Sequence, residues 1–152
     1  MHFADLLSPE VISIGPDWST FEETIDGLVA SLTRAGAIPE PVGREARAAL
    51  RIREGTSSTA VLEIGVGVPH ARLPGLAAPL VALAVRAAGL YEGAPTVPIR
   101  IVALVLSPAR TTDDHLRLLG GIATALRSPA LREALLRAST PQTALGVLHT
   151  YL

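Results

Sequence analysis

Residues 53–72 read REGTSSTAVLEIGVGVPHAR, and the rest of the chain is best interpreted outward from them. The stretch begins with the charged pair Arg53-Glu54 and a small polar turn, residues 55–59, and continues as an apolar run broken by glycines. It ends at Pro69-His70. Proline fixes its own φ and favours an extended conformation for the residue before it, so we expect the backbone that delivers His70 to be stiff.

Two interpretations of His70 follow from these residues. A neutral imidazole is a good nucleophile near neutral pH and can carry a covalent group between two reactions. An arginine folded back beside it would suit a phosphoryl group, because guanidinium offers paired donors to phosphate oxygens. The alternative is a packed, hydrogen-bonded and inert histidine at the end of a strand. The spacing alone favours that simpler interpretation.

The motif REGTSST followed by GVGVPHAR resembles the signature of the enzyme IIA domain of the sugar phosphotransferase system, fructose–mannitol type, which includes a nitrogen-regulatory version. Arg53-Glu54, Ser58-Thr59 and residues 67–71 stand where the family has its Arg-Glu pair, its Ser-Thr ending and its Pro-His motif. There are three departures: Gly67 replaces the usual alanine, Ala71 replaces the usual glycine, and the segment 61–66 is one residue longer with one glycine fewer.

His115 is the second histidine of interest, in the stretch Asp114-His115-Leu116. From the residues alone, it would be a surface histidine in the first turn of a helix, bonded to a neighbour. The resemblance implies that it lies beside His70. A second imidazole there can hydrogen-bond the first, fix its tautomer and donate to a phosphoryl group.

The resemblance implies an α/β fold with a mixed β-sheet flanked by helices. It also implies a phosphoryl carrier that needs no cofactor or metal. His70 would accept phosphate from an HPr-like phosphocarrier protein, with Arg53 and His115 as supporting donors. The group would then pass to a IIB domain or serve as a regulatory signal, so the chain would be a phosphotransferase component if it is active.

Two other functions stay open. The first is a regulatory binding module of the same fold that does not relay phosphate and binds a transporter, channel or kinase. The second is a metal-dependent hydrolase using His70 and His115 with Asp113 or Asp114. Two imidazoles and a carboxylate suit zinc, but this spacing matches no known ligand pattern.

Composition narrows the class of protein. The 152 residues predict a single domain over 1–152, and a net charge of −1 gives no basic footprint for nucleic acid. All thirteen basic residues are arginine, and the chain contains no cysteine, which fits a cytoplasmic protein. We see neither a signal peptide nor an unbroken apolar run of about 18 residues, so we expect no membrane insertion.

Local patterns predict the elements. We expect a strand at 11–14, a helix that begins after capping boxes at Ser19 and Thr20, and a second helix from Pro41 that runs into Arg53. Strands are predicted at 79–85 and 97–106, and Glu63 is placed at a strand edge facing water. Residues 72–76 are predicted as a loop and 87–96 as irregular. Helices should begin near Thr111, Ser128 and Thr140.

Overall fold

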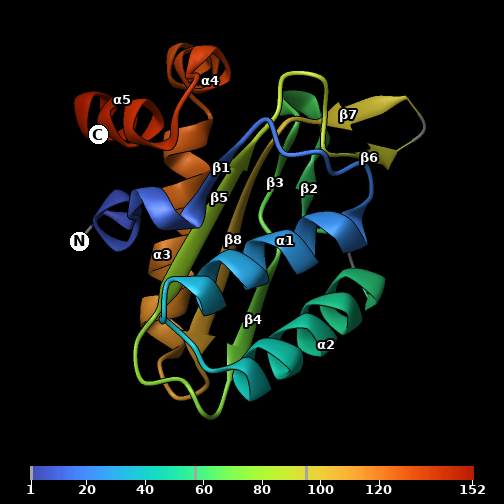
Figure 1. The fold of residues 1–152 in the computed structure, drawn as a ribbon, viewed down its shortest axis with the longest axis vertical. Coiled ribbons are helices and arrows are strands. Elements are labelled where there is room, and N and C mark those ends of the chain that lie inside the picture. Colours follow the sequence, from blue (N-terminus) through green and yellow to red (C-terminus); the bar gives the residue numbers. More distant parts are fainter. Residues whose placement is uncertain (1, 57, 95) are drawn as a thin grey trace.

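Strand β8, Ile101–Pro108, lies at the centre of the fold, and each of its residues is buried. The computed structural model describes residues 2–56, 58–94 and 96–152. Its mixed sheet has helices on both faces (Figure 1), which confirms the predicted fold class. A strand covered on both faces needs a continuous run of apolar residues, and residues 101–106, IVALVL, are such a run.

Parallel and antiparallel pairs alternate across the sheet. Strands β1 and β5 are parallel, β5 and β8 are antiparallel, β8 and β3 are parallel, and β3 and β2 are antiparallel. Besides β8, the strands on this path are β1 (Ile12–Ile14), β5 (Leu80–Val85), β3 (Val66–Gly67) and β2 (Ala60–Val61). The segment before His70 is therefore a short hairpin at the edge of the sheet.

One edge of β8 is shared by two short strands. Strand β3 pairs with Ile101 and Val102, whereas β4, His70–Leu73, pairs with Val105 to Pro108. Between them, the carbonyl of Pro69 accepts a hydrogen bond of 2.9 Å from the backbone N–H of Val105. His70 therefore starts a new strand halfway along the central strand.

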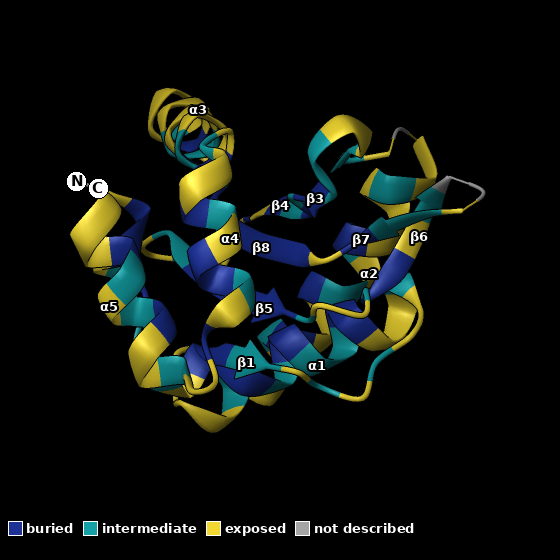
Figure 2. Cartoon of the chain, turned by 90° about the horizontal axis from the view of Figure 1, so that it is seen from above, coloured by how far each residue is buried: buried dark blue, intermediate teal, exposed yellow. Residues whose placement is uncertain are grey.

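Helices α1 and α2 cover one face of the sheet, and α3, α4 and α5 lie on the other (Figures 1 and 2). Helices α1 and α2 pack against each other, with α1 against β5 and α2 against β4. Helix α3 packs against β8 from the opposite side. The bounds are α1 Phe21–Arg34, α2 Glu40–Thr56, α3 Thr112–Leu126, α4 Pro129–Arg137 and α5 Pro141–Tyr151.

Helix starts follow the predicted caps. The hydroxyls of Thr20, Ser128 and Thr140 accept hydrogen bonds of 3.0, 3.2 and 3.1 Å from the backbone N–H three residues later. Helix α3 differs, because the Thr111 hydroxyl donates backwards to the carbonyl of Pro108 at 3.3 Å. The first turn of α3 is thus held by the preceding strand.

Two segments that were predicted as a loop or as irregular contain strands, so both predictions were wrong. Arg72 and Leu73 belong to β4 rather than to a loop, because β8 extends to Pro108 and offers them backbone partners. Within the segment predicted as irregular, β6 (Tyr91–Ala94) pairs antiparallel with β7 (Val97–Ile99); Pro95 lies outside the described residues.

The strand predicted at 97–106 is interrupted at Arg100. Its backbone N–H donates to the carbonyl of Gly65 at 2.9 Å, and its carbonyl accepts from Arg86 N–H at 2.9 Å. The chain changes here from the two-stranded sheet of β6 and β7 to the main sheet. Glu63 is exposed as predicted, but it lies in a 3-10 turn, Leu62–Ile64, rather than in a strand.

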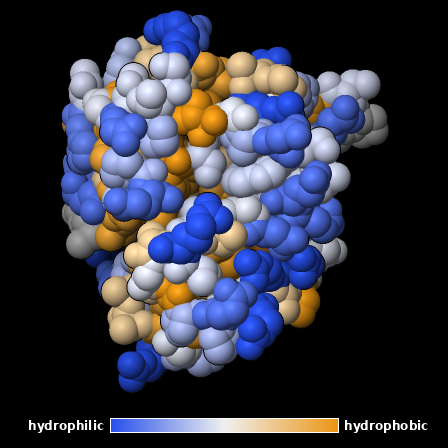
Figure 3. Space-filling model, in the orientation of Figure 1, coloured by the Kyte–Doolittle hydropathy of each residue, from blue (hydrophilic) through white to orange (hydrophobic). Residues whose placement is uncertain are grey.

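Hydrophilic and apolar side chains are interspersed over the face that carries α1 and α2 (Figure 3). A search of the described residues found no helix with the length and apolarity needed to cross a membrane.

Candidate functional site

The rings of His70 and His115 lie together, with centroids 5.5 Å apart and planes tilted by 52°. His70 is the first residue of β4, and His115 is in the first turns of α3. The two elements meet because β4 pairs with β8 and the chain enters α3 directly after β8. Two histidines separated by 45 positions in the sequence thus form one pair, as the resemblance predicted.

Half-buried His70 is fixed by its own backbone. Its Nδ1 lies 2.8 Å from the carbonyl oxygen of Val68. A carbonyl only accepts hydrogen bonds, so Nδ1 carries the proton. In the neutral ring, Nε2 then keeps its lone pair and is the nucleophilic atom. Pro69 holds the intervening backbone, as its fixed φ predicts.

His115 is held differently, since its side chain is only 6% exposed. Its Nδ1 lies 2.7 Å from the hydroxyl of Ser107, a buried residue near the end of β8. Burial lowers the pKa of His115, and the neighbouring charges of His70 and Arg72 lower this pKa further. The lowered pKa favours the neutral form of this ring.

Glu54 organises the polar turn that precedes β2. Its carboxylate accepts from the Ser58 hydroxyl at 3.2 Å, and from the backbone N–H and hydroxyl of Thr59 at 3.1 and 2.6 Å. These hydroxyls thus close the turn, whereas Ser57 lies outside the described residues. The carbonyl of Thr59 in turn accepts from the N–H of Val68 at 3.2 Å, which ties the turn to the backbone before His70.

Tyr91 explains why residue 67 is glycine. Its hydroxyl occupies the space that a Cβ at Gly67 would need, so alanine does not fit without movement. The tyrosine ring packs edge-on against Phe21 at 5.3 Å, and the side chain is 7% exposed. Within the described part of the chain, the hydroxyl has no hydrogen-bond partner. Burial raises the pKa of Tyr91, and the charge of Glu54 raises this pKa further.

Arg53 occupies the last turns of α2, where its side chain is exposed. Helix α2 packs against β4, the strand that begins with His70. The approach of Arg53 to the two histidine rings stays a prediction.

Two residues near the histidines were not predicted as part of the site. Ser107 gives no signal beyond being a polar residue that follows a buried strand, and it holds His115. Arg72 lies in a stretch that was predicted as a loop. Its Nη2 donates to the carbonyl of Ala109 and, at 2.7 Å, to the hydroxyl of Thr112.

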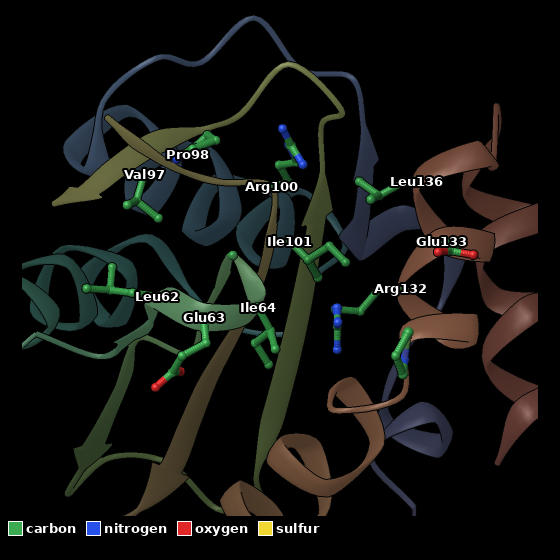
Figure 4. Close-up of a pocket in the computed structure, with 12 residues that line it drawn as sticks. Leu62, Glu63, Ile64, Val97, Pro98, Arg100, Ile101, Arg132, Glu133 and Leu136 are labelled. Atoms are coloured by element: carbon green, nitrogen blue, oxygen red, sulfur yellow. The ribbon is translucent and has the colours of Figure 1, made fainter. Parts of the chain in front are cut away.

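Other features offer less chemistry. Over residues 2–56, 58–94 and 96–152, no group of three or more His, Asp or Glu side chains is placed to hold a metal ion. A pocket of about 320 Å³ lies at the start of β8, where Ile64, Ile101 and Leu136 line it and Arg132 and Glu133 approach from α4 (Figure 4). Arg132 is engaged there with the carbonyl of Leu126 at 2.7 Å.

Known proteins resemble this chain in sequence and in fold. The family model described as "Phosphoenolpyruvate-dependent sugar phosphotransferase system, EIIA 2" matches residues 5–150. A curated relative, the PTS system fructose-specific EIIA component of Haloferax volcanii, is 33% identical over 141 residues, which cover 91% of this chain and 89% of the relative.

Two solved structures share the fold. The nitrogen regulatory protein IIA-Ntr of Neisseria meningitidis superposes with a TM-score of 0.80 at 22% identity, covering 95% of this chain and 97% of that one. The mannitol enzyme IIA of Escherichia coli was solved in complex with phosphorylated enzyme IIB. It superposes with a TM-score of 0.76 at 20% identity, covering 95% of this chain and 97% of that one. The chain therefore belongs to the EIIA 2 family of the phosphoenolpyruvate-dependent sugar phosphotransferase system.

Proposed function

We propose that this protein is a phosphoryl carrier in which His70 accepts phosphate from an HPr-like phosphocarrier. The observation that carries the proposal is the hydrogen bond between His70 Nδ1 and the carbonyl of Val68. It fixes the tautomer in which Nε2 is free to attack, on a ring that is only half-buried. A second imidazole lies beside this ring, with centroids 5.5 Å apart, where it could contact a phosphoryl group on His70.

In the proposed step, the lone pair of His70 Nε2 attacks the phosphorus of the donor's phosphohistidine. The new N–P bond forms as the donor's N–P bond breaks, and that bonding pair returns to the donor imidazole. His70 keeps its Nδ1 proton, and the positive charge that its ring gains is stabilised by the Val68 carbonyl. The attack and departure are in line, as in other phosphoryl transfers.

His115 and Arg53 are proposed to stabilise the charge on the phosphoryl oxygens. For neutral His115 to donate from Nε2, its Nδ1 must accept a hydrogen bond, and the Ser107 hydroxyl can donate it. Arg53 would approach from the last turns of α2, where guanidinium geometry suits phosphate oxygens. Such preorganised donors act where charge develops in the transition state.

The proposed destination of the phosphoryl group is a IIB domain, or the group stays on the protein as a regulatory signal. The complex of the Escherichia coli mannitol IIA with phosphorylated IIB supports the first of these. The fructose-specific relative supports a sugar branch. The similarity in fold to IIA-Ntr is the reason to test the nitrogen branch as well.

The experiment is incubation with phosphorylated carriers from both the sugar and the nitrogen branches. We expect one acid-labile, base-stable phosphoryl group per chain. Peptide mapping should place it on His70, and ³¹P NMR should show attachment at Nε2. Failure of both carriers on a folded protein would overturn the relay and leave the regulatory binding module in its place. Attachment at His115 would reverse the two histidine roles.

A further inference from the structure

Arg72 lies on the same face of β4 as His70. Side chains alternate along a strand, and burial follows this pattern: His70 and Arg72 are the more exposed pair, and Ala71 and Leu73 are buried. The face that His70 and Arg72 share is the one on which α3 packs, because His70 meets His115 and Arg72 meets Thr112.

The guanidinium of Arg72 connects β4 to the start of α3. Its Nη2 donates to the carbonyl of Ala109, in the turn after β8, and to the hydroxyl of Thr112, the first residue of α3. This turn and the first helical residue lie directly before His115. The Thr111 hydroxyl holds the same turn to β8, through its bond to the carbonyl of Pro108, and Arg72 adds the link to β4.

The backbone register adds a second link. Arg72 stands opposite Ser107 in the ladder between β4 and β8, and Ser107 is the residue that holds Nδ1 of His115. His115 is therefore held by two connections. The first is its own bond to Ser107 in β8, and the second is the link from Arg72 in β4 to the start of α3.

We propose that Arg72 is a positioning residue that ties the first turn of α3 to β4 and so sets where the His115 ring stands relative to His70. The effect of Arg72 on catalysis rests on the proposed phosphoryl transfer. Its effect on the position of the His115 ring does not depend on that transfer. The charge of Arg72 also lowers the pKa of His115, after the larger effect of burial and that of His70.

Two variants separate the tether from the charge. Arg72→Met removes both, whereas Arg72→Lys keeps a positive charge on a side chain that ends one bond short of the Nη2 position, from which both hydrogen bonds are made. Arg137→Met is the matched control, because it removes an exposed arginine at the end of α4 with the same change of net charge. Thermal unfolding of each variant shows whether it is folded before other data are compared.

NMR of the histidine rings tests the inference without any phosphoryl donor. We expect the cross-relaxation between the His70 and His115 rings to be lost in Arg72→Met and weakened in Arg72→Lys. The pKa of His115 should rise in Arg72→Met and stay nearer the wild-type value in Arg72→Lys. Unchanged ring contacts and an unchanged pKa in a folded Arg72→Met protein would overturn the proposal.

Transfer kinetics then distinguish positioning from partner docking. A misplaced supporting ring should lower kcat on the order of tenfold to a hundredfold and leave KM for the carrier unchanged. A rise in KM with unchanged kcat would assign Arg72 to the docking surface and overturn the positioning role. If the wild-type protein accepts no phosphate, the relay fails, and the NMR result still decides whether Arg72 positions His115.

Discussion

The supports of the two histidines differ in almost every respect. His70 is half-buried and is held by a carbonyl two residues away in its own segment. His115 is 6% exposed and is held by a hydroxyl from another element. The first support is local and engages Nδ1 of a half-buried ring, whereas the second is tertiary and buried.

This difference suits the two roles proposed for the rings. A nucleophile must reach a partner's phosphoryl group, so its support has to come from behind, through the backbone. A supporting donor must not move when charge develops, and a buried hydrogen bond in packed surroundings gives it that rigidity. The following variants break or sharpen this contrast.

Removal of either histidine ring should have the largest effect on phosphoryl transfer, and the two losses should differ in size. We expect His70→Ala to abolish phosphorylation, because the attacking atom is gone, and His115→Ala to slow it on the order of a hundredfold. Single-turnover transfer from a phosphorylated carrier measures both. His149→Ala, at the exposed end of α5, is the control and should retain full activity. Equal loss in both ring variants would contradict the division of roles.

Arg53→Ala tests whether the guanidinium of Arg53 donates to a phosphoryl group on His70. Loss of one preorganised donor should slow transfer on the order of a hundredfold with little change in stability, since the side chain is exposed. Arg44→Ala, another exposed arginine of α2, carries the same charge change. Equal rates in the two arginine variants would remove Arg53 from the mechanism.

Ser107→Ala breaks only the buried support. The Nδ1 of His115 would lose its partner, and an unsatisfied buried polar group costs about 1–3 kcal/mol of unfolding free energy. We also expect transfer to slow roughly tenfold, since His115 would lose the bond that orients it. Urea unfolding and transfer rates measure the two effects. Ser31→Ala, a buried serine of α1 bonded to the Leu28 carbonyl at 2.6 Å, should change stability but not rate.

Gly67→Ala disturbs the backbone that leads to His70. The new methyl would overlap the Tyr91 hydroxyl, and such overpacking costs about 1–3 kcal/mol. Tyr91→Phe alone should be neutral or slightly stabilising, because it removes a buried hydroxyl without a partner in the described chain. Combined with Gly67→Ala, it should restore part of the lost stability. Gly146→Ala, with open space around it, is the control, and additive effects at 67 and 91 would sink this explanation.

The smallest expected effect is on acid stability. The pKa of His115 is lowered in the folded chain, so the unfolded chain takes up this proton more readily. Its contribution to stability is complete above about pH 6.5, the ordinary histidine value, and is lost as the pH falls through the folded pKa. His115→Gln should therefore lose less unfolding free energy than wild type between neutral and acid pH. Parallel pH profiles in urea unfolding would argue against a neutral, buried His115.

Sequence predicted best what depends on local chemistry. Thr20, Ser128 and Thr140 mark helix starts because their hydroxyls bond N–H groups only three residues away. The pairing of His70 with His115 came from the family resemblance, and residue spacing alone favoured an inert histidine. Membership of the family and the mixed sheet are confirmed.

What sequence missed depends on partners distant in the chain. Arg72 and Leu73 are extended because β8 continues beyond Leu106, and Tyr91 to Ala94 form a strand because β7 returns beside them. Ser107 and Tyr91 matter through what they touch, His115 and Gly67, and neither contact leaves a periodic signal. The interruption at Arg100 likewise arises where the chain passes between two sheets.

The 3-10 turn at Leu62–Ile64 has an evolutionary consequence. It joins β2 to β3, and after it the carbonyl of Gly65 accepts from the N–H groups of Arg100 and Ile101 at 2.9 and 3.4 Å. Those bonds lie where β3 joins β8, whereas His70 takes its place from the separate pairing of β4 with β8 and from the bond between Pro69 and Val105. A residue gained in the turn, such as the extra one that the family resemblance implies between Val61 and Val66, would enlarge the hairpin tip and leave the pairing of β4 intact. A change in the length of this tip should therefore not displace the histidine.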